Sequence, residues 1–281
     1  MDASDDAGRV VRPQTLLLAL FGDQVLGRDV AVAAGSIIAV LNRLGVGEHA
    51  TRATVARMAR RDLLRPVRRG RQVYYGLAPR GVAVLRDGQR KLEAEIVDRE
   101  WDGRWTLLAF SVPETRRADR HALRTRLGWA GFAPLRSGLW VSPGTTDVSQ
   151  VLSELDLLDH AAVFRGEVAM WSDPAKIARE AWDLRALATS YRGFLDRWSG
   201  GVLGELDALS QRTRMTAEWL LLIRQDPRLP PALLPPEWPG VRAQEMFRTL
   251  QAELIGPAAE LAAAWLATIA DAGAQHRSAN I

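Results

Sequence analysis

The 281-residue chain contains no cysteine. This excludes disulfide bridges, thiolate catalysis and cysteine-ligated metal sites together. The chain also has no Walker phosphate-binding loop, no GxSxG nucleophile elbow and no GxGxxG dinucleotide fingerprint. We therefore expect no catalytic residues, no bound metal and no cofactor. The histidines are scattered without the spacing of a metal site: His49, His121, His160 and His276.

Long hydrophobic runs are also missing. No run of eighteen apolar residues occurs, and the first residues, MDASDDAGRVVRPQ, are polar and acidic without a hydrophobic signal segment. We therefore expect a cytoplasmic protein with no membrane-spanning helix. With 47% hydrophobic and 25% charged residues, the chain has the material for two or three globular domains.

Charge is distributed unevenly along the chain. The formal net charge is +4, yet the segment from Arg43 to Lys91 contains thirteen arginine or lysine residues against three acidic ones. That segment therefore carries +10, and the remainder carries about −6. A compact basic region on a mildly acidic body favours a polyanionic partner that binds at one end of the protein.

The basic segment contains the pattern of a helix with one apolar and one charged face. Within Thr51–Leu64, the large residues Val55, Met58 and Leu63 fall on one side when successive residues are placed about 100° apart. An arginine-rich helix face is usually only solvated surface, so this helix alone does not identify a function. The opposite face carries Arg52, Ala53, Arg57, Arg60 and Arg61.

A basic hairpin follows this helix. A strand ending at Val67 leads to a turn at residues 68–70, where Gly70 permits the tight reversal, and Val73–Tyr75 is predicted as the returning strand. Two helices are predicted upstream, at Pro13–Phe21 and Gly35–Leu44. The sequence therefore predicts two helices, a glycine turn, a basic helix and a basic hairpin.

This order is that of a winged helix-turn-helix, and a helix of about 14 residues, roughly 20 Å long, fits the major groove of DNA. We therefore predict double-stranded DNA as the partner of this domain. Arg52 and Arg57 are the candidates for base edges, and the hairpin arginines for phosphate or the minor groove. The full set of candidate DNA contacts is Thr51, Arg52, Arg57, Arg60, Arg61, Arg68, Arg69 and Arg71.

The next segment alternates between strand-like and helical periodicity in the order β-α-β-β-α-β. This order predicts a ferredoxin-like domain, a four-stranded antiparallel sheet covered by two helices. The predicted strands are residues 105–112, 132–135, 139–141 and 161–171, and the predicted helices are residues 116–128 and 148–158.

The remainder of the chain is predicted to be helical, at Ile177–Trp198, Leu203–Gln225 and Val241–Ala270, with a proline-rich loop at Asp226–Gly240. The predicted fold class is therefore α+β multidomain. The predicted domains are residues 1–97 (DNA binding), 98–173 (ferredoxin-like, dimerisation) and 174–281 (helical, effector binding or dimerisation).

Several stretches together resemble the PaaX family, repressors of phenylacetic acid degradation genes, over nearly the whole chain. The resemblance rests on their order and spacing, since no single motif is decisive. The stretches are Gly35–Glu48 (GSIIAVLNRLGVGE), Arg52–Leu64, Gly70–Tyr75 (GRQVYY), Trp101–Trp105 (WDGRW), Gly128–Phe132 (GWAGF) and Asp226–Gly240 (DPRLPPALLPPEWPG).

The resemblance implies a GntR-like winged helix, a central domain resembling the CRISPR-associated Cas2-type nucleases, and a helical C-terminal domain. It also implies a homodimer that binds palindromic promoter DNA and leaves it when an aryl-acetyl-coenzyme A, such as phenylacetyl-coenzyme A, binds. Another acyl-coenzyme A or an aromatic acid remains an alternative effector, because the motifs do not fix the pocket residues.

For such an effector, the C-terminal segment offers cations for phosphates and rings for an aryl group. Arg185 and Arg192 are seven residues apart and fall on one helical face. Solvated arginines and core aromatics are the alternative interpretation. The candidates are Arg185, Tyr191, Arg192, Arg214, Trp219, Arg224 and Trp238, with Arg212 and Phe194 as further cationic and aromatic residues of the same helices.

Two other functions fit the same architecture. A nuclease would need an acidic metal ligand at the end of the first central strand, where this chain has Ser111, with Glu114 nearby. A regulator that activates transcription, or that answers to a protein partner, is not separated from a repressor by sequence.

Overall fold

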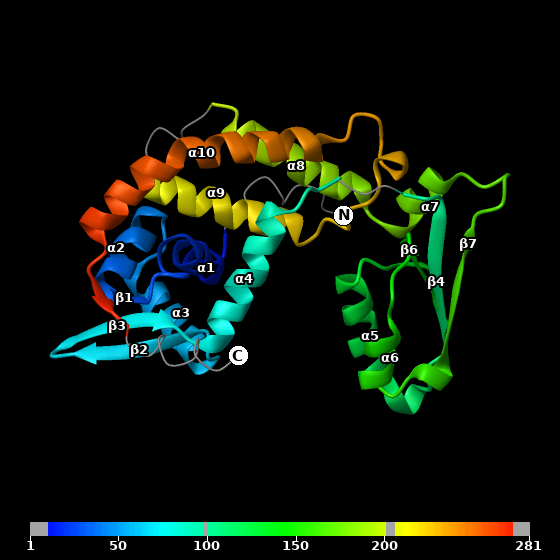
Figure 1. Cartoon of the computed structure of the whole chain (residues 1–281), viewed down its shortest axis with the longest axis horizontal. Coiled ribbons are helices and arrows are strands. Elements are labelled where there is room, and N and C mark those ends of the chain that lie inside the picture. The colour runs from blue at the N-terminus through cyan, green and yellow to red at the C-terminus, as the bar shows by residue number, and fades with distance from the viewer. Residues whose placement is uncertain (1–10, 98–100, 201–205, 272–281) are drawn as a thin grey trace. The chain divides into compact units, whose positions relative to one another are not determined.

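The structure, a computed structural model, describes residues 11–97, 101–200 and 206–271 (Figure 1). Its residues group into two compact units. Unit 1 comprises Met1–Ala94, Arg192–Ile223 and Arg242–Ile281, and unit 2 comprises Glu95–Tyr191 and Arg224–Val241. Each unit therefore joins parts of the chain that are far apart in sequence.

The N-terminal part of unit 1 contains the three helices and the hairpin that the sequence predicts. The basic helix runs from Glu48 to Arg60, so it begins three residues earlier than predicted and ends four residues earlier, and Leu64 begins the first hairpin strand instead. The elements are α1 (Pro13–Gln24), β1 (Val30–Ala33), α2 (Ala34–Arg43), α3 (Glu48–Arg60), β2 (Leu64–Arg69), β3 (Gln72–Leu77) and α4 (Pro79–Glu93).

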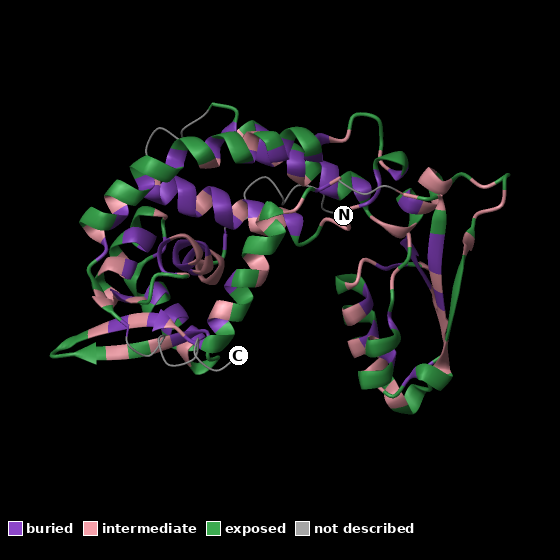
Figure 2. Ribbon diagram, in the orientation of Figure 1, coloured by how far each residue is buried: buried purple, intermediate pink, exposed green. Residues whose placement is uncertain are grey.

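The core of unit 1 is shared between these N-terminal helices and two helices from the end of the chain, α9 (Ala208–Ile223) and α10 (Pro239–Trp265). Leu17 of α1 lies in one buried cluster with Leu209 of α9 and Ala262 of α10. Helix α9 is buried along most of its length (Figure 2). Each buried leucine contributes roughly 1.5–3 kcal/mol, so α9 and α10 add several such contributions to the core that the N-terminal helices form.

A short strand near the C-terminus extends the N-terminal sheet. Strand β8 (Thr268–Ala270) pairs antiparallel with β1, which gives the strand order β2-β3-β1-β8. The predicted helix through Ala270 is therefore wrong at its end, since α10 stops at Trp265. The partner of β8 lies more than two hundred residues earlier, and such pairing leaves no trace in local periodicity.

An ion pair with little solvent exposure joins α9 to α1. Arg212 donates from Nε and Nη2 to the two carboxylate oxygens of Asp23, at 2.8 and 3.2 Å. Its Nη1 donates to the backbone carbonyl of Gln251 in α10, at 3.2 Å. The two charged side chains are only 10% and 15% exposed. Arg212, which the sequence offered as a cation for an effector, therefore holds three helices together.

Unit 2 contains the predicted β-α-β-β-α-β series as a four-stranded antiparallel sheet, in the order β5-β6-β4-β7. Helices α5 and α6 cover one face and bury Leu123 and Leu152 (Figure 1). The other face packs against α7 and the proline-rich loop, where Trp105 and Leu233 are buried. The elements are β4 (Arg104–Phe110), α5 (Arg117–Trp129), β5 (Ala133–Arg136), β6 (Leu139–Pro143), α6 (Ser149–Glu154), β7 (Ala161–Glu167) and α7 (Pro174–Ala181).

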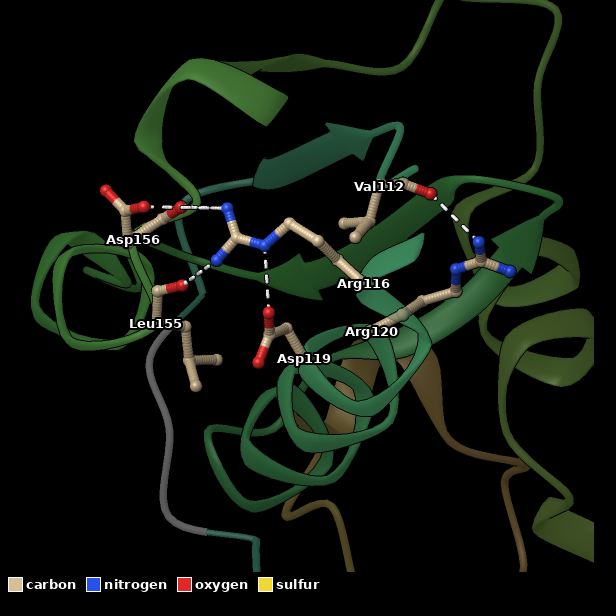
Figure 3. A network of polar contacts seen from close by, with 6 residues as sticks. All are labelled: Val112, Arg116, Asp119, Arg120, Leu155 and Asp156. Atoms are coloured by element: carbon tan, nitrogen blue, oxygen red, sulfur yellow. Dashed lines mark hydrogen bonds and ion pairs between the residues drawn. The ribbon is translucent and has the colours of Figure 1, made fainter. Parts of the chain in front are cut away.

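Two arginines fasten the start of α5 to its neighbours (Figure 3). Arg116 donates its two terminal nitrogens to the backbone carbonyls of Leu155 and Asp156, each at 2.8 Å. Arg120 donates to the carbonyl of Val112 at 2.9 Å. Carbonyls that follow a helix or strand have no partner within that element, so these guanidinium groups satisfy them. Both arginines are therefore structural.

The helical prediction for Ile177–Trp198 is corrected by the structure, which has two helices there, α7 and α8 (Leu184–Trp198). The carboxylate of Asp183 accepts a hydrogen bond from the backbone N–H of Ala186 at 3.0 Å and so begins a new helix. The division into domains at residues 98 and 174 stays a prediction.

Loss of the Arg212–Asp23 pair should destabilise unit 1. Arg212→Ala leaves the Asp23 carboxylate with little solvent and no cation, so we expect a loss of roughly 3 kcal/mol in the free energy of unfolding. Urea denaturation of the full chain measures it. The matched control is Arg90→Ala, which breaks an exposed pair with Asp87 and should cost less than about 1 kcal/mol. Equal losses in both variants would contradict the structural role of Arg212.

Candidate nucleic-acid interface

Helix α3 is held in unit 1 by one face only. Its buried residues are Thr51, Thr54, Val55 and Met58, which fall on one side of the helix. The chain enters from α2 through a turn in which Gly45 has a φ of +82°, the left-handed region that favours glycine. The opposite face of α3 is left to solvent.

A stripe of exposed residues runs along that open face. His49, Ala53, Ala56 and Arg60 are all exposed and follow one another at helical spacing, and Arg52 and Arg57 flank them. The sequence prediction missed His49, because it began the helix at Thr51. Two alanines lie in the middle of the stripe, and because their side chains are short, another surface can approach the helix backbone closely there.

Thr51 is a correction to the predicted interface. Its side chain is fully buried, and its hydroxyl donates to the carbonyl of Gly47 at 3.1 Å. It therefore belongs to the core of unit 1 and is removed from the candidate contacts. The arginines of α3 are exposed as predicted: Arg52, Arg57, Arg60 and Arg61.

The hairpin of β2 and β3 is tighter than predicted. The last paired residues are Arg69 and Gln72, so the turn consists of Gly70 and Arg71, and Gly70 has a φ of +60°. A glycine with positive φ at the first turn position is typical of a two-residue hairpin turn. Arg68 and Arg69 therefore lie in strand β2, and with Arg71 they are exposed.

Most of these cations have no anionic partner. Within the described ranges, no carboxylate forms an ion pair with Arg60, Arg68, Arg69 or Arg71. Arg52 pairs with Glu48 at 2.7 Å, but the two side chains are 63% and 60% exposed, and such pairs contribute little. The helix and the hairpin therefore present positive charge that the protein does not neutralise itself.

The base of the hairpin is tied to the end of the chain, which the sequence did not predict. Asp271, only 4% exposed, forms an ion pair with Arg65 of β2, and its backbone N–H donates to the carbonyl of Asp29 at 2.8 Å. Gly76 of β3 leaves room for the Asp271 carboxylate, since a Cβ at residue 76 would collide with it. Asp271 therefore joins both hairpin strands to β8.

The effector candidates are divided between the two units. Trp219 is 1% exposed and stacks on Phe247 with a centroid distance of 4.8 Å, so it is a core residue. Arg214 pairs with Glu218 at 3.0 Å. By unit, Arg192, Arg214 and Trp219 belong to unit 1, and Arg185, Tyr191, Arg224 and Trp238 belong to unit 2.

Tyr191 and Trp238 do contact each other, with centroids 5.9 Å apart. Tyr191 is fully buried, and its hydroxyl donates to the carboxylate of Asp226 at the start of the proline-rich loop. Burial raises the pKa of Asp226 and that of Tyr191 above their ordinary values. These contacts anchor the loop, and Tyr191 has no exposed face for a ligand, whereas Trp238 is partly exposed. Arg185, Arg192 and Arg224 are exposed.

A cavity of about 410 Å³ lies beside the hairpin of β5 and β6 in unit 2. Two arginines and Trp140 are among its lining residues, and a guanidinium group beside an indole suits a ligand with both an anion and an apolar part. Arg136 is also engaged by Glu180 at 3.0 Å. The lining residues are Arg124, Pro134, Leu135, Arg136, Ser137, Gly138 and Trp140.

The nuclease alternative gains no support from the geometry. Ser111 follows the end of β4, and Glu114 forms an ion pair with Arg120 at 2.8 Å. Throughout the parts of the chain that the structure describes, no three acidic or histidine side chains gather as metal ligands would. A helix both long enough and apolar enough to span a membrane is likewise not found among the described residues.

Comparisons with known proteins agree in covering most of the chain. Three family models match successive segments: "PaaX-like protein" at residues 12–81, "PaaX protein central Cas2-like domain" at residues 98–178, and "PaaX-like protein C-terminal domain" at residues 182–264. The transcriptional repressor PaaX of Escherichia coli (strain K12) is 28% identical over 261 residues, which is 87% of this chain and 81% of that protein.

Among solved structures, an uncharacterized protein of Mycobacterium tuberculosis, Rv0674, has a similar fold. The TM-score is 0.61 at 21% sequence identity, and the match covers 89% of this chain and 98% of the other.

Release of the contact at Asp271 should loosen the hairpin. In Asp271→Asn the ion pair with Arg65 is lost, so backbone amides of residues 64–77 should exchange with deuterium about tenfold faster, which corresponds to a loss of roughly 1.4 kcal/mol. Hydrogen-exchange mass spectrometry of the full chain measures this. The control is Asp87→Asn, which removes an exposed carboxylate in the same unit and should leave the exchange of these amides unchanged. If exchange is also unchanged in Asp271→Asn, the contact between Asp271 and Arg65 does not stabilise the hairpin.

Proposed function

The chain belongs to the PaaX family, and from this premise we propose that it is a transcriptional regulator that represses genes by binding double-stranded promoter DNA. The observation that carries the proposal is the open face of α3 together with the arginines of the β2–β3 hairpin, none of them buried. Phosphate groups of DNA supply the negative charge that this surface does not find within the protein.

The layout of unit 1 favours the docking mode of a winged helix-turn-helix. Helix α2, the Gly45 turn, α3 and the hairpin follow in that order. The thirteen residues of α3 span roughly 20 Å, and the major groove of B-DNA, about 12 Å wide, admits a helix. The exposed stripe of α3 would then face the base pairs, and the hairpin would lie along the backbone.

The two sets of arginines have different roles in this arrangement. Arg52 and Arg57, on either side of the stripe, would bridge guanine O6 and N7, which discriminates by roughly 1–3 kcal/mol per contact. Arg68, Arg69 and Arg71 contact phosphate or the minor groove and carry no sequence preference of their own. Arg60 and Arg61, at the end of α3, add to the positive field.

Two copies of the chain would read a palindromic operator. In a two-fold dimer the two α3 helices enter successive turns of the same groove, about 34 Å apart. The distance between the two α3 helices therefore determines the spacing that the two half-sites of the operator must have. If the operator lies where the bound protein recruits polymerase instead of blocking it, the same protein would be an activator.

For the effector we propose an aryl-acetyl-coenzyme A such as phenylacetyl-coenzyme A, with other acyl-coenzyme A thioesters and aromatic acids as the alternatives. An effector lowers the affinity for the operator if it binds more tightly to a conformation in which the two α3 helices no longer fit the operator. The size of the decrease is set by the ratio of the effector's affinities for the two conformations. The cavity beside the β5–β6 hairpin offers guanidinium groups from Arg124 and Arg136 for an anion, and Trp140 for a ring.

The two classes of DNA contact predict different mutant behaviour. Arg52→Ala should lower the affinity for the operator by about 5- to 100-fold, with much less effect on random duplexes. Arg69→Ala should weaken both duplexes alike and reduce the slope of log K against log salt by about one. Fluorescence anisotropy with labelled duplexes over a range of salt measures both. Arg90→Ala on α4 is the control and should change neither.

Equal losses on operator and random DNA for both variants would contradict the division of roles. A wild-type chain that binds no duplex at low salt would contradict the proposed function itself.

Ligand binding should stabilise the fold by an amount that grows with the logarithm of the ratio of ligand concentration to dissociation constant. At 100 times its dissociation constant, the true effector should add about 2.7 kcal/mol, seen as a rise in melting temperature. Differential scanning fluorimetry compares phenylacetyl-coenzyme A, coenzyme A and phenylacetate. In Arg124→Ala the rise should be reduced, whereas in Arg117→Ala, an exposed arginine of the same helix, it should persist. An equal rise in both variants would exclude the hairpin cavity.

A further inference from the structure

The stripe on the open face of α3 changes in chemistry along its length. It begins with the imidazole of His49 and ends with the guanidinium of Arg60, and between them it carries only the methyl groups of Ala53 and Ala56, both exposed. The two alanines are three residues apart, so their Cβ atoms lie about 5–6 Å apart on one side of the helix. The middle of the stripe can therefore contact a partner but cannot form side-chain hydrogen bonds with it.

The arginines that flank the stripe are held away from its middle. Arg52 donates from Nε to Oε1 of Glu48 at 2.8 Å, and Arg57 donates from Nη2 to Oγ1 of Thr54 at 3.1 Å. Glu48 and Thr54 both lie off the stripe, and Thr54 is buried. The two guanidinium groups therefore border the alanines without covering them.

The position of the alanines matters for the proposed docking. When a recognition helix lies in the major groove, residues in its N-terminal part contact the edges of the bases. Ala53 and Ala56 fall within the first nine residues of α3, which begins at Glu48. Their short side chains allow the helix backbone to come close to the base pairs at this point of the groove.

A methyl group selects among the four bases by what it cannot do. In the major groove, adenine, guanine and cytosine present hydrogen-bonding groups, whereas thymine also presents an apolar one, its C5-methyl group. A hydrogen-bonding group that loses water against an alanine gains no partner, and this costs free energy. Contact between two methyl groups has no such cost and removes apolar surface from water.

We propose that Ala53 and Ala56 contact the C5-methyl groups of two thymines in each half-site of the operator. Successive base pairs are about 3.4 Å apart along the duplex, so two alanines about 5–6 Å apart can reach two different base pairs. His49, one turn earlier on the same line, would donate a hydrogen bond to an acceptor such as purine N7 beside them. The inference rests on the proposed function in that α3 enters the major groove, and it adds the base group that the middle of the helix recognises.

The proposal is tested by removing the methyl groups from the DNA. The full chain selects its preferred duplex from a random library, and that duplex is synthesised again with deoxyuridine in place of thymidine, which removes the C5-methyl group and keeps the base pair. Affinity measured by fluorescence anisotropy should fall on the order of tenfold, because each buried methyl group contributes about fourfold. A random duplex with the same replacement should be bound as before, which separates methyl contact from a general change in the DNA.

Matching variants assign the effect to the two alanines. Ala53→Ser and Ala56→Ser each place a hydroxyl at the contact, so the ratio of affinities for the thymidine and deoxyuridine duplexes should fall to about threefold in each and approach one in the double variant. The control is Ala50→Ser, an exposed alanine of the same helix that lies about 100° around the axis from His49, and it should keep the wild-type ratio. Since each ratio compares two duplexes on one protein preparation, partial unfolding of a variant does not change it.

The outcomes separate this inference from the proposed function. Equal wild-type affinity for the two duplexes, selected half-sites without thymine, or a wild-type ratio in the double variant would overturn the methyl contacts and leave DNA binding intact. A library from which no duplex is enriched would overturn the proposed function, and the methyl contacts with it.

Discussion

The structure of unit 1 depends on the packing of α9 and α10 against the N-terminal helices. Leu17 and Leu209 lie in one buried cluster although nearly two hundred residues separate them. The Arg212–Asp23 pair restricts how α9 can be oriented against α1, because a bidentate contact with little solvent exposure requires a specific geometry. The exposed face of α3 is available to a partner because the other face is held by a core that the C-terminal helices complete.

This shared core explains which parts of the interface were predictable. Helix α3 and the β2–β3 hairpin are local structures, so the helical spacing of Val55 and Met58 and the glycine at residue 70 indicated both. The burial of Thr51 was not predictable in the same way, since it depends on the helix beginning at Glu48 and on neighbours from elsewhere in the chain. His49 was missed for the same reason.

Arginine is used in this chain for two purposes that sequence alone does not separate. Arg116 and Arg212 satisfy backbone carbonyls or a carboxylate of the protein, whereas Arg60 and Arg69 have no such partner in the described residues. The difference is set by which carbonyl or carboxylate the fold brings within reach. The candidate effector residues were chosen by residue type along helices, and that choice did not anticipate that Trp219 is a core residue. The central sheet, by contrast, followed from alternating periodicity.

The pairing of β1 with β8 has a consequence for synthesis on the ribosome. A strand formed by residues 30–33 must wait for residues 268–270 before its second neighbour exists, and closing so large a loop is entropically costly and slow. Until then the nascent N-terminal segment exposes apolar surface that α9 and α10 later cover, and such surface is prone to aggregation. A product released early, without its last helix and strand, would therefore lack part of the core that supports α3 and would be a natural substrate for proteases.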